Sequence, residues 1–331
     1  MTSRLDRRVL GAAIIALASL GAASMPALAQ DDDKLIAIAN FGPHVTLDQA
    51  IEGFKKALAD KGFVEGENVE YEYAHGNFDP SLVPQILRSL EARDPDLMLT
   101  ITTPITQAAM NLVEDKSIPI VFTVVTDPVA AGVVPSWDKG SDRFVGASNM
   151  QSLEAVLDFA GDLLGEMDSM GMLYNPGDVA DTTQLAQARE VAAAAGIEFK
   201  AEGVESVNDI QQRTMALNGV DFIYVPSSSL LQPALPAAAS AAERMGVPII
   251  NASHPAVREH VVLASVSISW EQVGYNSGLL AAEILNGAKP SELSNSRPAI
   301  NEHIPLISAK RLEAAGMTLP DALASCDCVV E

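Results

Sequence analysis

The stretch that decides the fold is 94–128, DPDLMLTITTPITQAAMNLVEDKSIPIVFTVVTDP, because its pattern returns later in the chain. It reads as a strand led by aspartate, a hydroxyl cluster, a helix, a second strand that follows proline, and a polar residue before proline. Residues 220–255, VDFIYVPSSSLLQPALPAAASAAERMGVPIINASHP, give the same order. The matching positions are Asp96 with Asp221, Thr102-Thr103 with Ser227-Ser228, Pro119 with Pro248, and Asp127-Pro128 with His254-Pro255. This ordered series predicts two similar α/β lobes in tandem.

The same alternation extends beyond the repeat. Further strands are predicted at KLIAIA (34–39), VEYEYA (69–74), GMLYN (171–175), IEFKAE (197–202) and VVLASV (261–266). Apolar residues at helical spacing predict helices over 47–62, 80–93 and 182–196. Strands that alternate with helices in this way indicate βαβ units and parallel sheets with helices on both faces. The fold class we predict is α/β, with two Rossmann-like lobes.

The hydroxyl clusters mark the expected binding cleft. Ligands of open parallel sheets bind beyond the carboxyl ends of the strands. Thr102-Thr103 and Ser227-Ser228 each end a predicted strand and precede a helix. Helix N-termini offer unpaired N–H groups and a positive dipole end, which suit an anion such as a carboxylate. Helix capping is the alternative interpretation, because Thr and Ser are favoured N-cap residues.

The segment 265–290, SVSISWEQVGYNSGLLAAEILNGAKP, continues from the last strand of the second lobe into an amphipathic helix. We expect Ser267–Trp270 to be a hinge crossing that returns the chain to the first lobe, with its side chains facing the cleft. Ser267 or Ser269 would contact the ligand, or Ser269 would cap the helix. Trp270 would either stack on a flat ligand or wedge the lobes apart.

The N-terminus is typical of a secretory signal peptide. Arg4, Arg7 and Arg8 precede an apolar run, and MPALAQ offers an A-x-A site that predicts cleavage after Ala29. A membrane anchor is the alternative, but the run is short and ends in small residues. The only two cysteines lie in SCDCVVE at the C-terminus, where two thiols or a local disulfide is favoured over a metal site.

Charge and motifs limit the function. The net charge is −22, and removal of residues 1–29, which carry a net charge of +2, makes it −24. Such a surface repels nucleic acid. Nucleophile-elbow, zinc-protease, phosphate-loop and dinucleotide motifs are absent, and the five histidines lack metal-ligand spacing. We therefore expect a binding protein with no catalytic residues, metal or cofactor.

In its motifs the chain resembles the type I periplasmic substrate-binding proteins of ABC importers, in the branch that binds tryptophan and other aromatic amino acids. The resemblance is carried, in order, by HVTLDQAIEGFKKAL, IPIVFTVVTDPVAAGVV, GMLYNPGD, VDFIYVPSSS and WEQVGYNSGLLAAEILNGAKPSEL. It implies ligand capture by closure of two lobes joined by a three-stranded hinge, with bounds 30–148 plus 268–298 and 149–267 plus 299–331. The pocket residues it implies are Phe41, His44, Thr102, Thr103, Thr126, Asp127, Asn175 and Ser228.

Similar proteins tend to carry a carboxylate where this chain has Ser269, before the aromatic Trp270. Asp127 is the residue we expect to take over the ammonium contact. The ligand we expect is a small carboxylate, an aromatic or branched amino acid being the first choice. A sugar-binding protein of the same fold, or a sensor module for a membrane receptor, is the alternative. The resemblance implies a monomer in the periplasm with a membrane permease and an ATPase as partners.

Overall fold

The computed structural model describes residues 33–331. The predicted signal peptide and its cleavage near Ala29 lie outside this range. Two separate sheets are present in the described chain, one of five strands and one of seven. The sheet with five strands and its helices are called the first lobe below, and the sheet with seven strands and its helices the second lobe.

The first lobe contains an all-parallel sheet in the order β2-β1-β3-β4-β5. Its strands are β1 (Lys34–Asn40), β2 (Val69–His75), β3 (Leu97–Ile101), β4 (Ile120–Thr123) and β5 (Phe144–Ala147). Side chains of β1 alternate between two cores: Ile36 and Ile38 pack under α1 (Val45–Asp60) and α9 (Trp270–Leu285), whereas Ala37 packs under α2 (Val83–Glu91) and α3 (Thr103–Leu112). Helices therefore cover both faces of the sheet, as parallel strands require.

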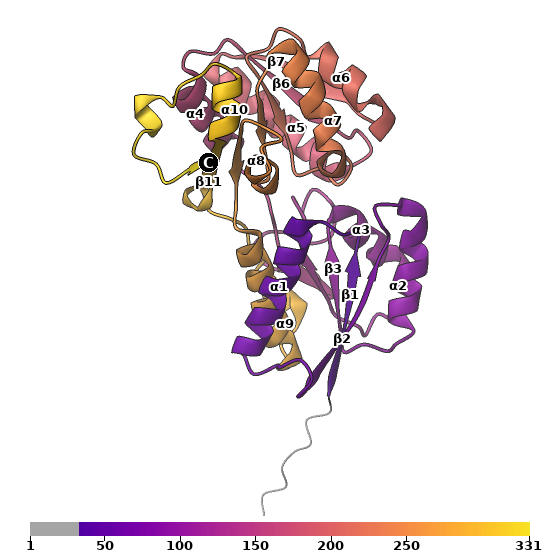
Figure 1. Cartoon of the computed structure of the whole chain (residues 1–331). Helices are drawn as coiled ribbons and strands as arrows, with labels where there is room; N and C mark the ends of the chain where they lie inside the picture. The colour runs from indigo at the N-terminus through magenta and orange to yellow at the C-terminus, as the bar shows by residue number, and fades with distance from the viewer. Residues whose placement is uncertain (1–32) are drawn as a thin grey trace, which may run out of the picture. The chain divides into compact units, whose positions relative to one another are not determined.

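Helices α1 and α9 lie side by side although they come from opposite ends of the described chain (Figure 1). Glycines make this close approach possible. A Cβ atom added at Gly274 would overlap the carbonyl oxygen of Ala50, and one added at Gly53 would overlap that of Glu271. A Cβ at Gly278 would meet the Cβ of Ala57 at 2.7 Å. The two backbones thus pack without side chains between them.

The second lobe has the strand order β12-β11-β10-β9-β8-β6-β7. Its strands are β6 (Ser169–Tyr174), β7 (Glu198–Gly203), β8 (Phe222–Val225), β9 (Ile249–Asn251), β10 (Ala264–Ser267), β11 (Ile304–Ser308) and β12 (Val329–Val330). Only the β10–β11 pair is antiparallel. Its helices are α4 (Leu153–Leu164), α5 (Val179–Ala195), α6 (Ile210–Ala216), α7 (Leu231–Met245), α8 (Pro255–Arg258) and α10 (Ala309–Ala314). Separate cores lie on its two faces, which confirms the predicted fold class.

The sequence repeat corresponds to repeated hydrogen bonding. The Asp96 carboxylate accepts from the Leu35 amide at 2.9 Å, at the start of β1. The Asp221 carboxylate accepts from the Ser169 amide at 2.8 Å, at the start of β6. Each aspartate therefore accepts from an amide at the start of the neighbouring strand, which explains why this residue type directly precedes both β3 and β8.

The chain passes between the two lobes at three places. These segments are 148–152, 268–269 and 293–303. They follow β5, β10 and the short 3-10 helix Pro290–Glu292, which comes after α9. Two of them are paired, because the Ser148 amide donates to the Ser296 carbonyl at 2.8 Å. This bond holds two of the three crossing segments side by side.

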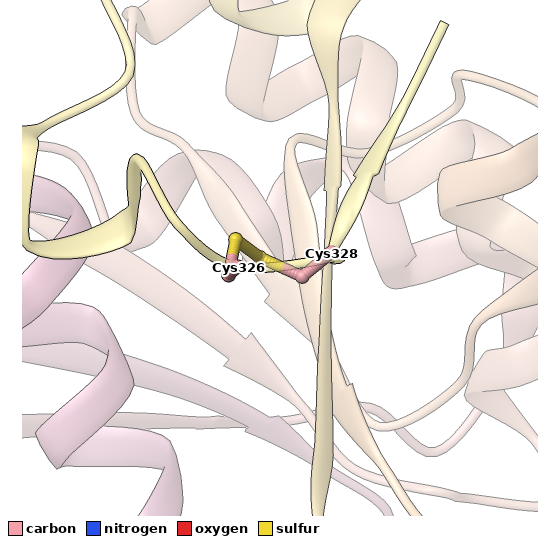
Figure 2. The surroundings of a disulfide bond; sticks show 2 residues. All are labelled: Cys326 and Cys328. Carbon is pink, nitrogen blue, oxygen red and sulfur yellow. A yellow bond between two sulfur atoms is a disulfide. The ribbon is translucent and has the colours of Figure 1, made fainter.

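The C-terminus is joined to the second sheet. A disulfide links Cys326 to Cys328 just before the edge strand β12 (Figure 2). The Ile307 amide donates to the Cys328 carbonyl at 2.7 Å, so this short loop is continuous with the sheet. The cysteines thus form a local disulfide, one of the two forms that the sequence favoured over a metal site.

Candidate functional site

A pocket lies where the carboxyl ends of the strands of both lobes meet. The first lobe contributes His44, Phe78, Thr102, Thr103, Thr126 and Trp270. The second lobe and the crossing that leads to it contribute Asn149, Asp178, Ser227, Ser228, Gln232 and Ser253. The pocket has a cavity volume of about 40 Å³, which is enough for a few water molecules. We call it the interlobe pocket.

The first-lobe wall is built from strained backbone. Thr102, at the N-cap of α3, has φ 81°, and Val124, after β4, has φ 59°. Both are β-branched, so a positive φ is a genuine outlier that costs about 1–3 kcal/mol. Phe78, with φ 62°, also lines the pocket. Such strain clusters at ligand-binding sites, and within residues 33–331 three of the six non-glycine residues with positive φ line this one pocket.

Hydroxyls at the start of α3 are positioned for a ligand. The Thr102 Oγ1 atom is buried and has no hydrogen-bond partner among the described residues. The Thr103 Oγ1 atom accepts from the Thr126 amide at 3.4 Å. Because the Thr103 hydroxyl proton is not used in that bond, both threonines retain a donor for an incoming acceptor.

A chain of side chains connects the two lobes across the pocket. The Thr126 hydroxyl donates to Asn149 Oδ1 at 3.3 Å, and Asn149 Nδ2 donates to Ser227 Oγ at 2.9 Å. Thr126 follows β4 in the first lobe, and Ser227 follows β8 in the second. Asn149 therefore connects Thr126, at the end of β4, to Ser227 of the second-lobe hydroxyl cluster.

The second-lobe wall includes the other predicted cluster. Ser228 Oγ accepts from the Leu231 amide at 3.3 Å, which satisfies one of the free N–H groups at the start of α7. The capping interpretation is thus correct for the Ser228 hydroxyl oxygen. Ser228 also lines the pocket, so capping and ligand contact are compatible at this residue.

Two buried carboxyl groups lie at the start of α5. Asp178 is its N-cap residue, with Oδ1 accepting from the Ala180 amide at 2.9 Å. Asp181 is fully buried, and its Oδ2 accepts from the Asn175 amide at 2.6 Å. Burial raises the pKa of both groups, and the negative charge of Asp178 helps to raise the pKa of Asp181 to about 7. The Ser228 hydroxyl and the Asn175 amide act on the pKa of Asp181 in the opposite direction.

Asp181→Asn is expected to stabilise the protein most above pH 7. The folded state holds a proton on Asp181 that the unfolded state has lost, so wild-type stability falls as pH rises from about 4 to about 7. Each pKa unit corresponds to about 1.4 kcal/mol, and we expect a gain of at least about 1 kcal/mol at pH 8 that shrinks toward pH 4. Thermal melting from pH 4 to pH 8 measures it.

Asp221→Asn is the matched control for this pH dependence. Hydrogen bonds from Ser169 lower the pKa of Asp221, so its contribution is present above the unfolded pKa and is lost as pH falls. The control should therefore lose stability above pH 4, the opposite sign. Equal pH profiles for wild type and Asp181→Asn would contradict the assignment.

His44 and Trp270 have structural partners as well as a face on the pocket. His44 caps α1, with Nδ1 2.8 Å from Thr46 Oγ1, and burial lowers its pKa, which favours the neutral ring. Trp270 is 4% exposed, packs in the core beneath α1 and α9, and donates from Nε1 to Ser267 Oγ at 3.2 Å. The indole is therefore held rigidly against the pocket wall.

Five predicted residues are not part of the pocket lining, namely Phe41, Asp127, Asn175, Ser267 and Ser269. Phe41 packs edge-on behind Phe78, with ring centroids 5.8 Å apart. Asp127 accepts from the amides of Val129 and Ala130, and Asn175 from that of Gly177, so both close turns. Ser267 is buried against Trp270, and Ser269 caps α9.

Other lining residues were not predicted from the sequence. They include Phe78, Asn149, Asp178, Gln232 and Ser253, and Ser227 was placed at the cleft without being assigned a contact. Ser227 belongs to the recognised hydroxyl cluster, and Asp178 ends the GMLYNPGD motif, so both carried a signal in the sequence. Asn149 follows β5, a strand of four residues that was not predicted.

Comparisons with known proteins identify the family of this chain. Residues 35–328 match the ABC transporter substrate binding protein family. The chain belongs to this family. Family members act outside the cytoplasmic membrane, where they bind a substrate for transport. The family assignment made from the sequence motifs is thereby confirmed.

Individual relatives support this assignment. A tyrosine-binding protein of Clostridioides difficile (strain R20291) is 31% identical over 261 residues, which are 78% of this chain and 75% of the relative. A conserved domain protein from Vibrio cholerae superposes with a TM-score of 0.85 at 28% identity, covering 90% of this chain and all of the other. An ABC domain of Streptococcus pneumoniae in complex with L-Trp gives a TM-score of 0.84 at 24% identity, with the same coverage.

Residues 33–331 show neither a cluster of metal ligands nor a helix suited to span a membrane. Within residues 33–331, no three or more His, Cys, Asp or Glu side chains are grouped so as to hold a metal ion. None of the helices in the described part of the chain combines the length and apolar character needed to cross a bilayer.

Proposed function

We propose that this substrate-binding protein captures an aromatic α-amino acid in the interlobe pocket and delivers it to the permease of an ABC importer. The observation that carries the proposal is the pair of matched hydroxyl clusters, which start α3 and α7 on opposite sides of one pocket. The two helix N-termini suit the ligand carboxylate. Phe78 and Trp270 offer aromatic faces for its side chain. The tyrosine-binding relative supports this ligand class.

The protein acts by binding and not by catalysis. The pocket side chains are donors, acceptors and aromatics, and the buried carboxyls are not paired with a hydroxyl or thiol nucleophile activated by a base. Its partners would be a small-molecule ligand, the membrane permease and the ATPase. We propose a monomer in the periplasm that is released there by cleavage near Ala29.

Closure of the lobes would trap the ligand. We propose lobe bounds of 30–148 plus 268–298 and 149–267 plus 299–331, which agree with the strands found in each sheet. The pocket has a volume of only about 40 Å³, so the lobes would separate to admit an aromatic amino acid and then close around it in a wider arrangement than the one described. The Asn149–Ser227 hydrogen bond is the contact that opening would break. Ligand that bridges both walls then favours the closed state by its difference in affinity for the two states.

A thermal-shift screen over amino acids, organic acids and sugars tests the ligand class. A ligand that binds only the native state raises the melting temperature. At a ligand concentration of 100 times Kd, the free energy of unfolding increases by about 2.7 kcal/mol. We expect L-tyrosine or L-tryptophan to give the largest shift. A shift with sugars alone would favour the sugar-binding alternative and reject the proposal.

Thr103→Ala and Ser228→Ala are each expected to weaken amino-acid binding by about 1–3 kcal/mol, the loss of a hydrogen bond to a charged group. Titration calorimetry with the amino acid identified by the screen measures it. Ser308→Ala is the matched control, because Ser308 Oγ accepts from the Arg311 amide at 3.2 Å in the same capping role outside the pocket. The control should lose stability and keep affinity. Unchanged affinity in both pocket variants would contradict the site.

A further inference from the structure

The interlobe pocket contains one acidic side chain without a cation. Among its lining residues only His44 and Asp178 have ionisable side chains, and none is lysine or arginine. Asp178 is 6% exposed and takes part in none of the salt bridges among residues 33–331. A buried carboxylate in such surroundings is costly unless a positive charge reaches it.

The second oxygen of Asp178 is available on the pocket side. Oδ1 accepts from the Ala180 amide, whereas Oδ2 accepts no hydrogen bond from the described residues. Oδ2 is also not among the atoms that are fully buried without a partner, so it keeps contact with open space. Asp178 also lines the interlobe pocket, which places this carboxylate within reach of a bound ligand.

Asp181 strengthens the demand for a cation at this wall. It lies one turn further along α5, is fully buried, and its Oδ1 has no hydrogen-bond partner in the described chain. The pKa of each carboxyl is raised, which reports that neither finds a compensating positive charge within the protein. His44 does not supply one, since burial lowers its pKa and favours the neutral ring.

The pocket therefore presents regions of opposite polarity. The starts of α3 and α7 present hydroxyls and the positive ends of helix dipoles, and the start of α5 presents a carboxylate. A molecule that carries a carboxylate and an ammonium group on one carbon matches both. A carboxylate alone, or a neutral sugar, would leave Asp178 without a cation.

We infer that Asp178 accepts the α-ammonium group of the ligand and so selects zwitterionic amino acids over the same acids without an amino group. The inference rests on the proposed function. Asp178 takes the place of Asp127, from which the sequence led us to expect this contact. Asp127 does not line the pocket, and its Oδ1 accepts from the Val129 and Ala130 amides. Asp178 is a binding residue here, and no covalent step is involved.

Asp178→Asn with two pairs of probes tests the inference. The probes are L-tyrosine with 3-(4-hydroxyphenyl)propionate and L-tryptophan with indole-3-propionate, each titrated by calorimetry. Wild type should prefer the amino acid of a pair by at least about tenfold, the value of a hydrogen bond between charged groups. Asp178→Asn should lose at least about tenfold for the amino acid and leave the des-amino acid within about twofold.

Asp127→Asn is the matched control. It changes a carboxylate that also accepts from the amide two residues on, at 3.0 Å, but lies outside the pocket. It should keep the wild-type preference.

The Asp178 variants should fold. Asparagine is as good an N-cap as aspartate, so α5 should remain intact in Asp178→Asn. If that variant fails to fold, Asp178→Ser supplies a second capping residue without charge.

The outcomes separate this inference from the proposed function. A wild-type protein that binds neither L-tyrosine nor L-tryptophan overturns the proposed function and the inference with it. If wild type prefers the amino acids over the des-amino acids and Asp178→Asn shows the same preference, the inference alone is overturned. Loss of preference in Asp178→Asn and its retention in Asp127→Asn support the inference.

Discussion

Gly274→Ala is expected to lower the free energy of unfolding by at least about 3 kcal/mol, the upper part of the range for overpacking. The added methyl group would overlap the Ala50 carbonyl oxygen, and a backbone atom of a facing helix cannot rotate away as a side chain can. Helices α1 and α9 would have to move apart, which disturbs the core that both share over β1 and β3. Urea denaturation of the purified protein measures the loss.

Gly161→Ala is the control for this prediction. Gly161 lies inside α4, and a Cβ placed there meets no atom within 4 Å. Alanine is favoured over glycine in a helix by about 1 kcal/mol, so this variant should be slightly more stable than wild type. If Gly274→Ala were as stable as Gly161→Ala, the close packing of α1 and α9 would be wrong.

Trp270→Ala is expected to cost about 3–5 kcal/mol of stability, as large-to-small changes in cores do. The side chain is almost completely buried, its ring fills the core under α1 and α9, and its N–H group bonds to Ser267. Trp270→Phe keeps most of the volume and should cost clearly less. Chemical denaturation compares the three proteins.

The same residue reports on the ligand. The chain has two tryptophans, Trp137 and Trp270, and only the second lines the interlobe pocket. L-Tyrosine should change the fluorescence of wild type and of Trp137→Phe but not that of Trp270→Phe. If Trp270→Phe binds with unchanged affinity, the indole serves as a wedge between lobes; weaker binding indicates that it stacks on the ligand. A fluorescence change that survives in Trp270→Phe would contradict its place in the pocket.

The fold was largely predictable because its signals are local. Each long strand is a β-branched run between helical patterns, and the repeat of Asp96 and Asp221 marks equivalent strand starts. The strands that were not predicted are β5, β11 and β12, of four, five and two residues. They are short, no helix lies between β4 and β5, and β11 contains Pro305 and pairs antiparallel, so these strands depart from the βαβ order that carried the other predictions.

The binding site was predictable only in part, for a different reason. Thr102, Thr103 and Ser228 could be placed because parallel strands end at a common edge, whatever the other lobe does. Asn149 and Asp178 belong to the pocket because two lobes meet there, and a single sequence carries no direct signal of that meeting. Asp127 and Asn175 show the converse, since turn formation accounts for the side-chain bonds of both.

The pairing of α1 with α9 also has a consequence for the order in which the protein folds. The first lobe contains the earliest described residues, yet one of the two helices on that face is contributed by residues 270–285. A growing polypeptide cannot finish this half until most of it has been synthesised, because the missing helix exposes a wide apolar surface on the sheet. The first lobe is therefore the half that completes late, although its strands are made first.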